Sequence, residues 1–307
     1  YYTIDLDALK AISSFNSISL LLAVVALVAG MYFDGLRLQR LVKIGGYKLS
    51  IRAVLRVIFS NYFMAMLTPG ASGGAVAQVL VLRSYGVPIS KGTPIVLIRT
   101  VFSIMFLVIM LPLVFLRDAI EIPYISRDML LIFAVLAVIA ALVGTYILQT
   151  KYMRQFVYNL AQRFKAHNTK DWLSKLETLN QGLGLLYKQP VQSLIVFIES
   201  GLSLLCLYCI APALMYAFTP DIPIIDILDR MILLNLILYF APTPGGTGIA
   251  EGLFVVLFSA FVPNGTVGII AVGWRVVAEY MPFFIGMYAV LTLYGRQFVA
   301  QETSREQ

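Results

Sequence analysis

Long apolar stretches separated by short polar segments make up most of this chain. Five of them approach the roughly 20 residues that a helix needs to cross a bilayer, and they cover residues 17–36, 92–115, 129–149, 190–217 and 267–294. Two further apolar segments, 51–86 and 228–262, are interrupted near their middle by proline and glycine. Such an interruption predicts two half-helices joined by a turn. We therefore predict an all-α polytopic membrane protein with two broken, re-entrant helical hairpins.

The two interrupted segments resemble each other. Residues 61–74 read NYFMAMLTPGASGG, and residues 235–248 read NLILYFAPTPGGTG. About 30 residues after each turn an arginine, Arg99 or Arg275, stands within an apolar run. Proline disrupts a helix interior and glycine permits a tight reversal. The predicted turn residues are Pro69, Gly70, Pro244, Gly245 and Gly246.

The repeated segments predict an inverted repeat within a single transmembrane domain, residues 1–307. The first repeat covers about 17–115 and the second about 190–294. A linking span, 129–149, and an amphipathic segment, 150–188, connect them. Broken apolar segments at matching positions of two halves indicate the binding site of a transporter.

Charge along the chain orients this topology, because cytoplasmic loops carry an excess of lysine and arginine. One set of loops contains Asp34 against many basic residues: Arg37, Arg40, Lys43, Lys48, Arg52, Arg56, Arg83, Lys91, Lys151, Arg154, Arg163, Lys165, Lys170, Lys175, Lys188, Arg296 and Arg305. The opposite loops are mainly acidic, with Asp5, Asp7, Asp118, Glu121, Asp128, Asp221, Asp226 and Asp229 against Lys10, Arg117, Arg127 and Arg230. We predict that the first set, with the C-terminus, is cytoplasmic. The first hairpin then enters from the cytoplasm and the second from outside.

Residue 1 is a tyrosine that this topology places outside the cell. We therefore expect a further span upstream of the sequence given. The segment 150–188 should lie on the cytoplasmic surface, with an apolar face toward the membrane and basic residues toward anionic headgroups.

The hairpin turns predict an anion site. Ser72 and Thr247 occupy equivalent positions, where their hydroxyls could cap the second half-helix of each hairpin. The positive N-terminus of each such half-helix would attract an anion at mid-membrane. The predicted substrate contacts at these turns are Ser72, Gly73, Thr247 and Gly248.

Five charged residues stand inside the predicted spans or hairpins: Arg99, Arg275, Glu199, Glu251 and Glu279. Intramembrane charges are costly and indicate functional sites. Glu279 follows Arg275 at i+4, where the two can pair, and Glu251 can approach from the hairpin. Arg99 has no acidic partner in the predicted membrane segments of its own half, so we expect it to be the freer phosphate ligand; pairing with a glutamate of the second half is the alternative. Glu199, Glu251 and Glu279 are candidates for a proton relay, and Glu199 equally for a helix-to-helix hydrogen bond.

Composition supports the membrane class. The chain is 60% hydrophobic and 13% charged, with a mean hydropathy of +0.85, against about 25% charged in soluble proteins. The net charge of +7 follows from basic residues that flank apolar runs, so topology explains it better than nucleic-acid binding. Cys206 and Cys209 lie in an apolar run, and His167 is the only histidine. We expect no metal, no cofactor and no catalytic residue.

The run APTPGGTGIAE at 241–251 resembles the signature of the lysylphosphatidylglycerol synthase transmembrane (flippase-like) family. The resemblance extends over essentially the whole chain, through residues 68–74, Gln78, Arg83, Trp274, Arg275, Pro282 and Gly286. It implies a protein that moves or handles lipids. Ala71 and Gly74 depart from the charged or polar residues of many members, so the resemblance leaves the backbone and Ser72 of this loop for substrate contact.

These observations favour a flippase or lipid-binding transporter of the cell inner membrane that carries a lipid with a phosphate headgroup, an anionic or modified phospholipid or glycolipid, between leaflets. One alternative is a membrane-embedded enzyme that acts on lipid-linked substrates, with Glu251 and Glu279 as acid and base. Another is a scaffold for a lipid-modifying partner enzyme. The sequence contains no GxxxxGK[ST] motif for ATP. A homo-oligomer stays open.

Overall fold

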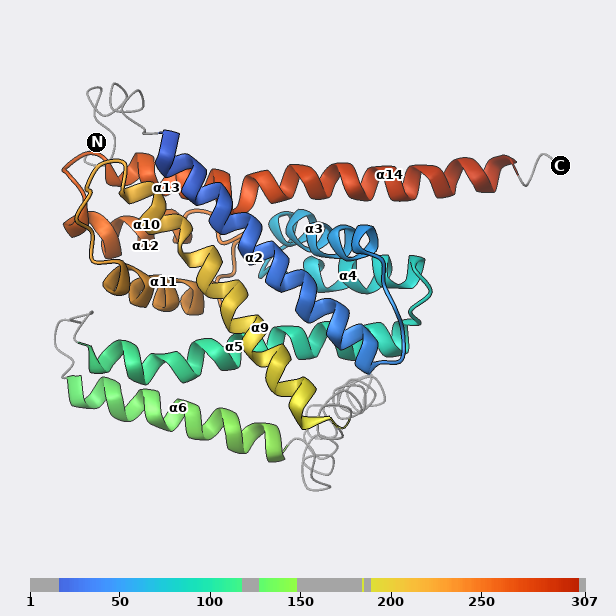
Figure 1. Ribbon diagram of the computed structural model, residues 1–307, viewed down its shortest axis with the longest axis horizontal. Coiled ribbons are helices and arrows are strands. Elements are labelled where there is room, and N and C mark those ends of the chain that lie inside the picture. The colour runs from blue at the N-terminus through green and yellow to red at the C-terminus, as the bar shows by residue number, and fades with distance from the viewer. Residues whose placement is uncertain (1–16, 118–126, 148–183, 185–188, 304–307) are drawn as a thin grey trace, which may run out of the picture.

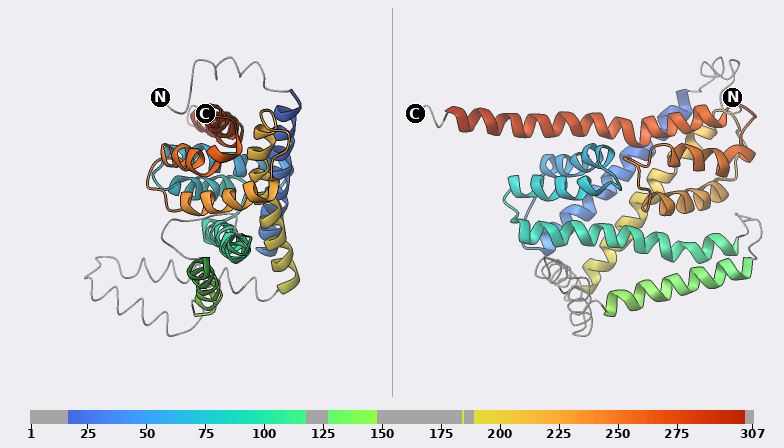
Figure 2. Two further views of the ribbon diagram at one scale, coloured as in Figure 1. Left: turned by 90° about the vertical axis from the view of Figure 1, so that its left-hand side faces the viewer. Right: turned by 180° about the vertical axis from the view of Figure 1, so that it is seen from behind.

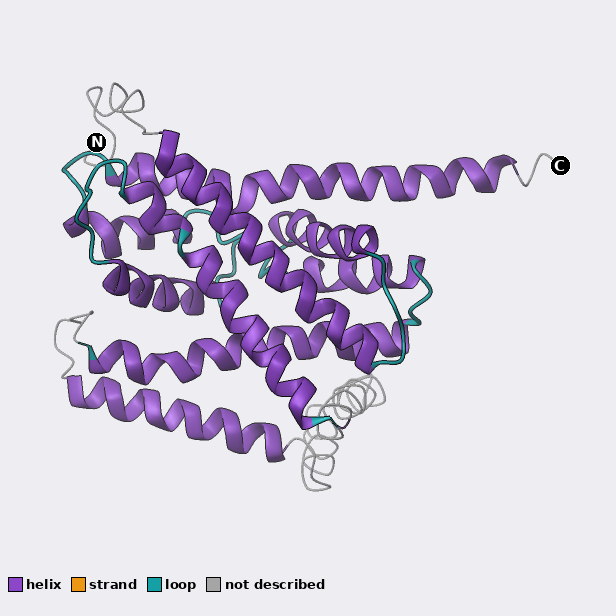
Figure 3. Ribbon diagram, viewed as in Figure 1, coloured by secondary structure: helices purple, strands orange, loops and turns teal. Residues whose placement is uncertain are grey.

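The computed structural model describes residues 17–117, 127–147, 184 and 189–303. Throughout these ranges the regular structure is helical, as Figure 3 shows. The predicted span 129–149 corresponds to α6 (Arg127–Ile147). The N-terminal segment 1–16, His167 and nearly all of the predicted amphipathic segment 150–188 lie outside the described ranges.

Four helices of the described part are long and apolar enough to cross a membrane. They are α2 (Ser17–Ile44), α5 (Ile89–Leu116), the run Pro190–Met215 formed by α9 (Pro190–Tyr208) and α10 (Ile210–Met215), and the run Val267–Leu293. The last run combines α13 (Val267–Arg275), a π-helical turn (Val276–Tyr280) and the start of α14 (Met281–Thr303). The predicted all-α polytopic membrane fold is confirmed.

The end of the first predicted span is wrong. The span was placed at residue 36, but α2 continues to Ile44 as one helix. Asp34 and Arg37 therefore belong to a buried helix, not to a cytoplasmic loop, and they are 3% and 6% exposed. The helix ends where Gly46 adopts a φ of +88°, a conformation that glycine tolerates.

Each interrupted segment forms a helical hairpin. The first consists of α3 (Ile51–Leu67) and α4 (Ser72–Ser84), and the second of α11 (Ile224–Leu238) and α12 (Ile249–Phe258), which a short 3₁₀ turn (Ser259–Phe261) follows. The hairpins come from opposite ends of the molecule, and their tips meet near its middle (Figure 1). An isolated antiparallel β-bridge joins Pro69 to Pro244 at this meeting point.

Long helices surround the two hairpins. α2 and α9 pack against each other and run obliquely across one side of them, while α5 and then α6 lie below (Figures 1 and 2). Large apolar side chains are exposed on these helices, for example Leu21 on α2, Leu136 on α6 and Leu194 on α9, at 62%, 54% and 59% exposure. Because lipid tails solvate such side chains and water does not, this surface suits a bilayer.

α14 passes along α3 and continues beyond the body of the molecule (Figure 2). The two backbones touch at Gly286, where an added Cβ would lie 2.1 Å from the carbonyl oxygen of Phe59. No side chain fits there, so glycine permits the contact. The last helix is therefore held directly against the first hairpin.

Candidate functional site

A cavity of about 560 Å³ lies where the hairpin tips meet. Its walls come from α2, α3, α4, α5, α9, α11 and α13, from both hairpin turns and from the π-helical turn. Four ionisable acid or arginine side chains line it: Asp34, Arg37, Arg99 and Glu279. The arrangement concentrates charge at the centre of a membrane-spanning fold, where charges are costly unless they serve a function.

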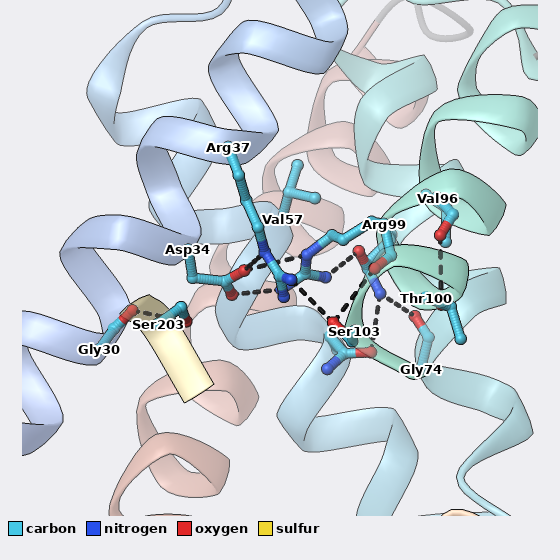
Figure 4. A network of polar contacts seen from close by, with 12 residues as sticks. Gly30, Asp34, Arg37, Val57, Gly74, Val96, Arg99, Thr100, Ser103 and Ser203 are labelled. Atoms are coloured by element: carbon cyan, nitrogen blue, oxygen red, sulfur yellow. Dashed lines mark hydrogen bonds and ion pairs between the residues drawn. The ribbon is translucent and has the colours of Figure 1, made fainter. Parts of the chain in front are cut away.

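One wall of the cavity carries two arginines that share one aspartate, as Figure 4 shows. Arg37 donates from Nε to Asp34 at 2.5 Å, and Arg99 donates from Nε to the same oxygen at 3.0 Å. Arg99 also bonds the second carboxylate oxygen of Asp34. Arg37 donates further to the Ser103 hydroxyl at 2.8 Å. Two guanidinium groups against one carboxylate leave this wall, which we call the positive wall, with an excess charge of +1.

Arg99 therefore does not have the free guanidinium that the sequence predicted. Its partner is Asp34, which we predicted to lie in a loop because the predicted span ends at residue 36. Arg99 therefore has an acidic partner in its own half of the chain, and that partner is not a glutamate of the second half. Arg37 is a cavity residue that sequence reasoning missed. Its i,i+3 spacing from Asp34 is a helical signal that was present in the sequence.

Arg99 also reaches the first hairpin through a chain of amides. It bonds the side-chain oxygen of Gln78 on α4, and Gln78 donates to Asn61 on α3 at 2.7 Å. Both amides line the cavity. The positive wall is thus connected to both helices of the first hairpin, some distance along the chain from the turn itself.

The second arginine is held in a different way. Arg275 is 1% exposed and pairs with Glu279 and, from Nε, with Glu251 at 2.9 Å. It also donates to the carbonyl oxygen of Gly245 at 2.9 Å and to the Thr247 hydroxyl at 3.3 Å. Arg275 therefore ties the turn of the second hairpin to the last membrane helix. One guanidinium against two carboxylates gives this cluster, the negative cluster, an excess charge of −1.

The turn hydroxyls behave alike in both hairpins, but they do not cap the half-helices as predicted. Ser72 donates to the carbonyl oxygen of Pro69 at 3.0 Å, and Thr247 donates to that of Pro244 at 2.8 Å. In each hairpin the hydroxyl thus bonds the carbonyl oxygen of the proline in the same turn. Neither residue stands at an N-cap, because the N-cap positions of α4 and α12 are Ala71 and Gly248.

Other groups take the capping role. The Gly73 amide donates to the Thr68 hydroxyl at 2.8 Å, and the matching Gly248 amide donates to the Glu251 carboxylate at 2.7 Å. The N-terminus of α12 is therefore already occupied by an anion of the chain itself. The predicted anion site at this terminus is filled in the present conformation, whereas the first hairpin has no carboxylate at the corresponding place.

Glu199 lies outside the cavity lining. It accepts from Arg40 at 2.7 Å, and Arg40 also contacts Gln192, so the cluster joins α2 to α9. This is the interhelical contact that the sequence gave as one of two options. Cys206 and Cys209 are free and half-buried, and a search of the described residues finds no group of side chains suited to a metal ion.

The fold and cavity define a polytopic α-helical membrane protein in which two broken hairpins meet tip to tip over a charged central cavity. The chain belongs to the family of the lysylphosphatidylglycerol synthase TM region, whose model matches residues 2–286. It is similar to a UPF0104 membrane protein of Archaeoglobus fulgidus, with 22% identity over 288 residues, or 90% of this chain and 86% of the relative. The family that the motifs at 68–74 and 241–251 indicated is confirmed.

Proposed function

We propose that this protein carries a lipid with a phosphate headgroup between the leaflets of its membrane. The observation that supports the proposal is the positive wall, which lines a cavity at the place where the tips of the two hairpins meet. An excess positive charge in a low-dielectric site is costly when it is alone. A phosphate placed against Arg37 and Arg99 would relieve that cost, and guanidinium groups suit its geometry.

The two charged clusters would orient the headgroup. The phosphate would face the positive wall on α2 and α5, away from the acidic side chain that Glu279 contributes to the cavity from the π-helical turn, because that carboxylate repels an anion. The same acidic side would favour a cationic substituent on the headgroup, as in a modified phospholipid. The family takes its name from a synthase of lysylphosphatidylglycerol, a lipid of that kind.

Transport would proceed by alternating access. In this proposal the two hairpins form inverted repeats, and each tip closes the cavity toward one leaflet. The acyl chains would stay in the bilayer beside the exposed apolar side chains of the tips, Leu67 and Phe240, which are 54% and 76% exposed. Lipid binding drives such a change only if its affinity differs between the two conformations.

Reconstitution into phosphatidylcholine vesicles tests the proposal. A tail-labelled fluorescent phosphatidylglycerol in the inner leaflet becomes accessible to a membrane-impermeant quencher only after it crosses. We expect faster crossing with the wild-type protein than with empty vesicles, and a loss of this gain in the Arg37→Ala/Arg99→Ala protein. Lys43→Ala is the matched control, because it removes an exposed positive charge from the same helix α2.

The chemical state of the labelled lipid separates the alternatives. A transporter changes the sidedness of the lipid and leaves its structure intact, which mass spectrometry after extraction verifies. A chemically altered lipid would identify a membrane-embedded enzyme. Unchanged sidedness and structure with well-folded protein would contradict transport and leave the scaffold role.

A further inference from the structure

The positive wall and the negative cluster have equal and opposite excess charges. The wall carries an excess of +1, because its two arginines share Asp34. The negative cluster carries an excess of −1, because Arg275 pairs with both Glu251 and Glu279. An anion that binds at the positive wall would end this balance. It would leave one negative charge uncompensated in a low-dielectric site, where such a charge is costly.

The two clusters lie close enough to act on each other. Helix α2, which carries Asp34 and Arg37, packs against the π-helical turn Val276–Tyr280, which carries Glu279. The hydroxyl of Tyr62 on α3 interacts electrostatically with Glu279 and with all three side chains of the positive wall. Tyr62 and Glu279 both line the cavity. A headgroup at the positive wall is therefore within electrostatic reach of Glu279.

Glu279 is the carboxylate of the negative cluster that is placed to accept a proton. Its side chain is 21% exposed and lines the cavity, whereas Arg275 and Glu251 do not line it. Glu251 is committed to the Gly248 amide at 2.7 Å and to Nε of Arg275 at 2.9 Å. Protonation of Glu279 would leave Arg275 and Glu251 as a one-to-one pair, so it would strand no charge. A π-helical turn, such as the one that carries Glu279, is frequent at functional sites.

The other groups near the cavity do not offer the same proton site. Around Glu279 the described part of the chain places Arg275, Glu251, Tyr280, Tyr62 and the positive wall. A tyrosine is ordinarily neutral near pH 7 and has no proton to gain. Asp34 already balances two guanidinium groups, so its protonation would add to the excess positive charge of the wall. Glu199 pairs with Arg40 outside the cavity lining.

We propose that Glu279 takes up a proton when an anionic headgroup binds at the positive wall, so that the lipid and the proton cross the membrane together. This rests on the proposed function and lets a proton gradient drive it. The proton comes from the aqueous phase and binds a carboxylate oxygen of Glu279, so the added charges of −1 and +1 cancel. A headgroup that also carries a cationic group needs no proton, because its cation can pair with ionised Glu279.

The pH dependence of binding tests this coupling. Short-chain phosphatidylmethanol has one charged group, its phosphodiester, whereas phosphatidylethanolamine also carries an ammonium group. Trp274 lines the cavity, and Trp172→Phe leaves it as the single tryptophan of the chain, so its fluorescence can follow either titration. We expect the affinity for phosphatidylmethanol to fall as the pH rises, by up to about tenfold per pH unit for one linked proton. The affinity for phosphatidylethanolamine should change much less near neutral pH.

Glu279→Gln separates the proposed proton site from other causes of pH dependence. The amide takes up no proton and leaves Arg275 paired with Glu251, so we expect a folded protein whose affinity for phosphatidylmethanol does not vary with pH. Glu199→Gln is the matched control, because it removes a buried acid outside the cavity lining and should keep the wild-type pH dependence. A pH dependence that persists in Glu279→Gln, or that is absent from the wild-type protein, would overturn the coupling. Failure of phosphatidylmethanol to bind at any pH would overturn it as well.

A pH gradient across vesicles tests whether the proton and the lipid cross together. With the wild-type protein, tail-labelled phosphatidylmethanol should accumulate in the leaflet that faces the alkaline solution, beyond its level in protein-free vesicles, because protons move toward that side. In Glu279→Gln this accumulation should be lost. Crossing that ignores the gradient in the wild-type protein would overturn joint transport and leave the proposed function intact. Proton-linked binding without crossing would contradict the proposed function and support Glu279 as the proton site.

Discussion

Asp34 is the residue on which the positive wall depends, because both arginines bind it. Replacement of either Arg37 or Arg99 by alanine leaves Asp34 with one partner, so we expect each single change to lower the free energy of unfolding by only about 1 kcal/mol. The double replacement strands a buried carboxylate, which costs about 3–5 kcal/mol. The combined loss should therefore exceed the sum of the single losses. Denaturant unfolding in detergent measures all three.

Asp34→Asn in the double-alanine background is the matching control. It removes the stranded charge and should recover most of the lost stability. Additive effects of the two arginine replacements would contradict the shared carboxylate, because independent sites add and coupled sites do not.

Arg275 should mainly stabilise the fold. Arg275→Ala leaves Glu251 and Glu279 without their common partner and releases the turn of the second hairpin. We expect a loss of about 3–5 kcal/mol in the free energy of unfolding. Addition of Glu279→Gln should restore part of it, since Glu279 is the less exposed of the two acids. A fully stable Arg275→Ala protein would show that the negative cluster does not hold this hairpin in place.

At the scale of the elements, the first hairpin contains a strained turn. Ala71 precedes α4 with a φ of +53°, a left-handed conformation that costs an L-residue about 1–2 kcal/mol. The second hairpin uses glycines at its positive φ positions, such as Gly245 and Gly246. We expect Ala71→Gly to raise the thermal midpoint in detergent, and Gly246→Ala to lower it. Gly246→Ala also brings a Cβ within 3.0 Å of Leu238.

The turn comparison has a clear control. Ala75→Gly lies on the same half-helix, one turn into α4, where glycine is less favourable than alanine by about 1 kcal/mol. This change should lower the midpoint while Ala71→Gly raises it. Changes of the same sign at both positions would contradict the strain at Ala71.

At the scale of the whole molecule, the contact between the hairpin tips should control access to the cavity. Residues paired across an antiparallel bridge have Cα atoms about 4.5–5.5 Å apart, a separation that a disulfide spans. We therefore expect Pro69→Cys/Pro244→Cys to cross-link on oxidation in a background without Cys206 and Cys209. Lipid crossing should stop when the tips are joined and return after reduction.

Each single cysteine variant serves as the control, because oxidation should leave its crossing rate unchanged. Full activity of the cross-linked protein would show that the tips do not need to separate. The cross-link itself is assessed by a mobility shift on non-reducing electrophoresis.

Sequence patterns predicted the elements better than their partners. Long apolar stretches and the proline–glycine interruptions located the spans and both hairpins, because these signals are local. The partner of Arg99 was missed because a charged stretch inside α2 looks like the end of a span when read alone. Asp34 and Arg37 find polar partners in Arg99 and Ser103 of α5, which lie more than 60 residues further along the chain. The capping of Gly248 by Glu251 was hidden for a related reason, since Thr247 offered an equally local alternative.

Through the glycine contact between the last helix and the first hairpin, the thickness of the bilayer should affect the position of that hairpin. The apolar run Val267–Leu293 has 27 residues, about 40 Å at 1.5 Å per residue, and exceeds the roughly 30 Å hydrocarbon core. Such a helix tilts more in a thin bilayer than in a thick one. Gly286 contacts the backbone of α3 without an intervening side chain. A change in the tilt of the last helix should therefore displace the first hairpin. Lipid crossing should therefore vary with acyl-chain length of the vesicles, and a bulkier residue at Gly286 should uncouple the two.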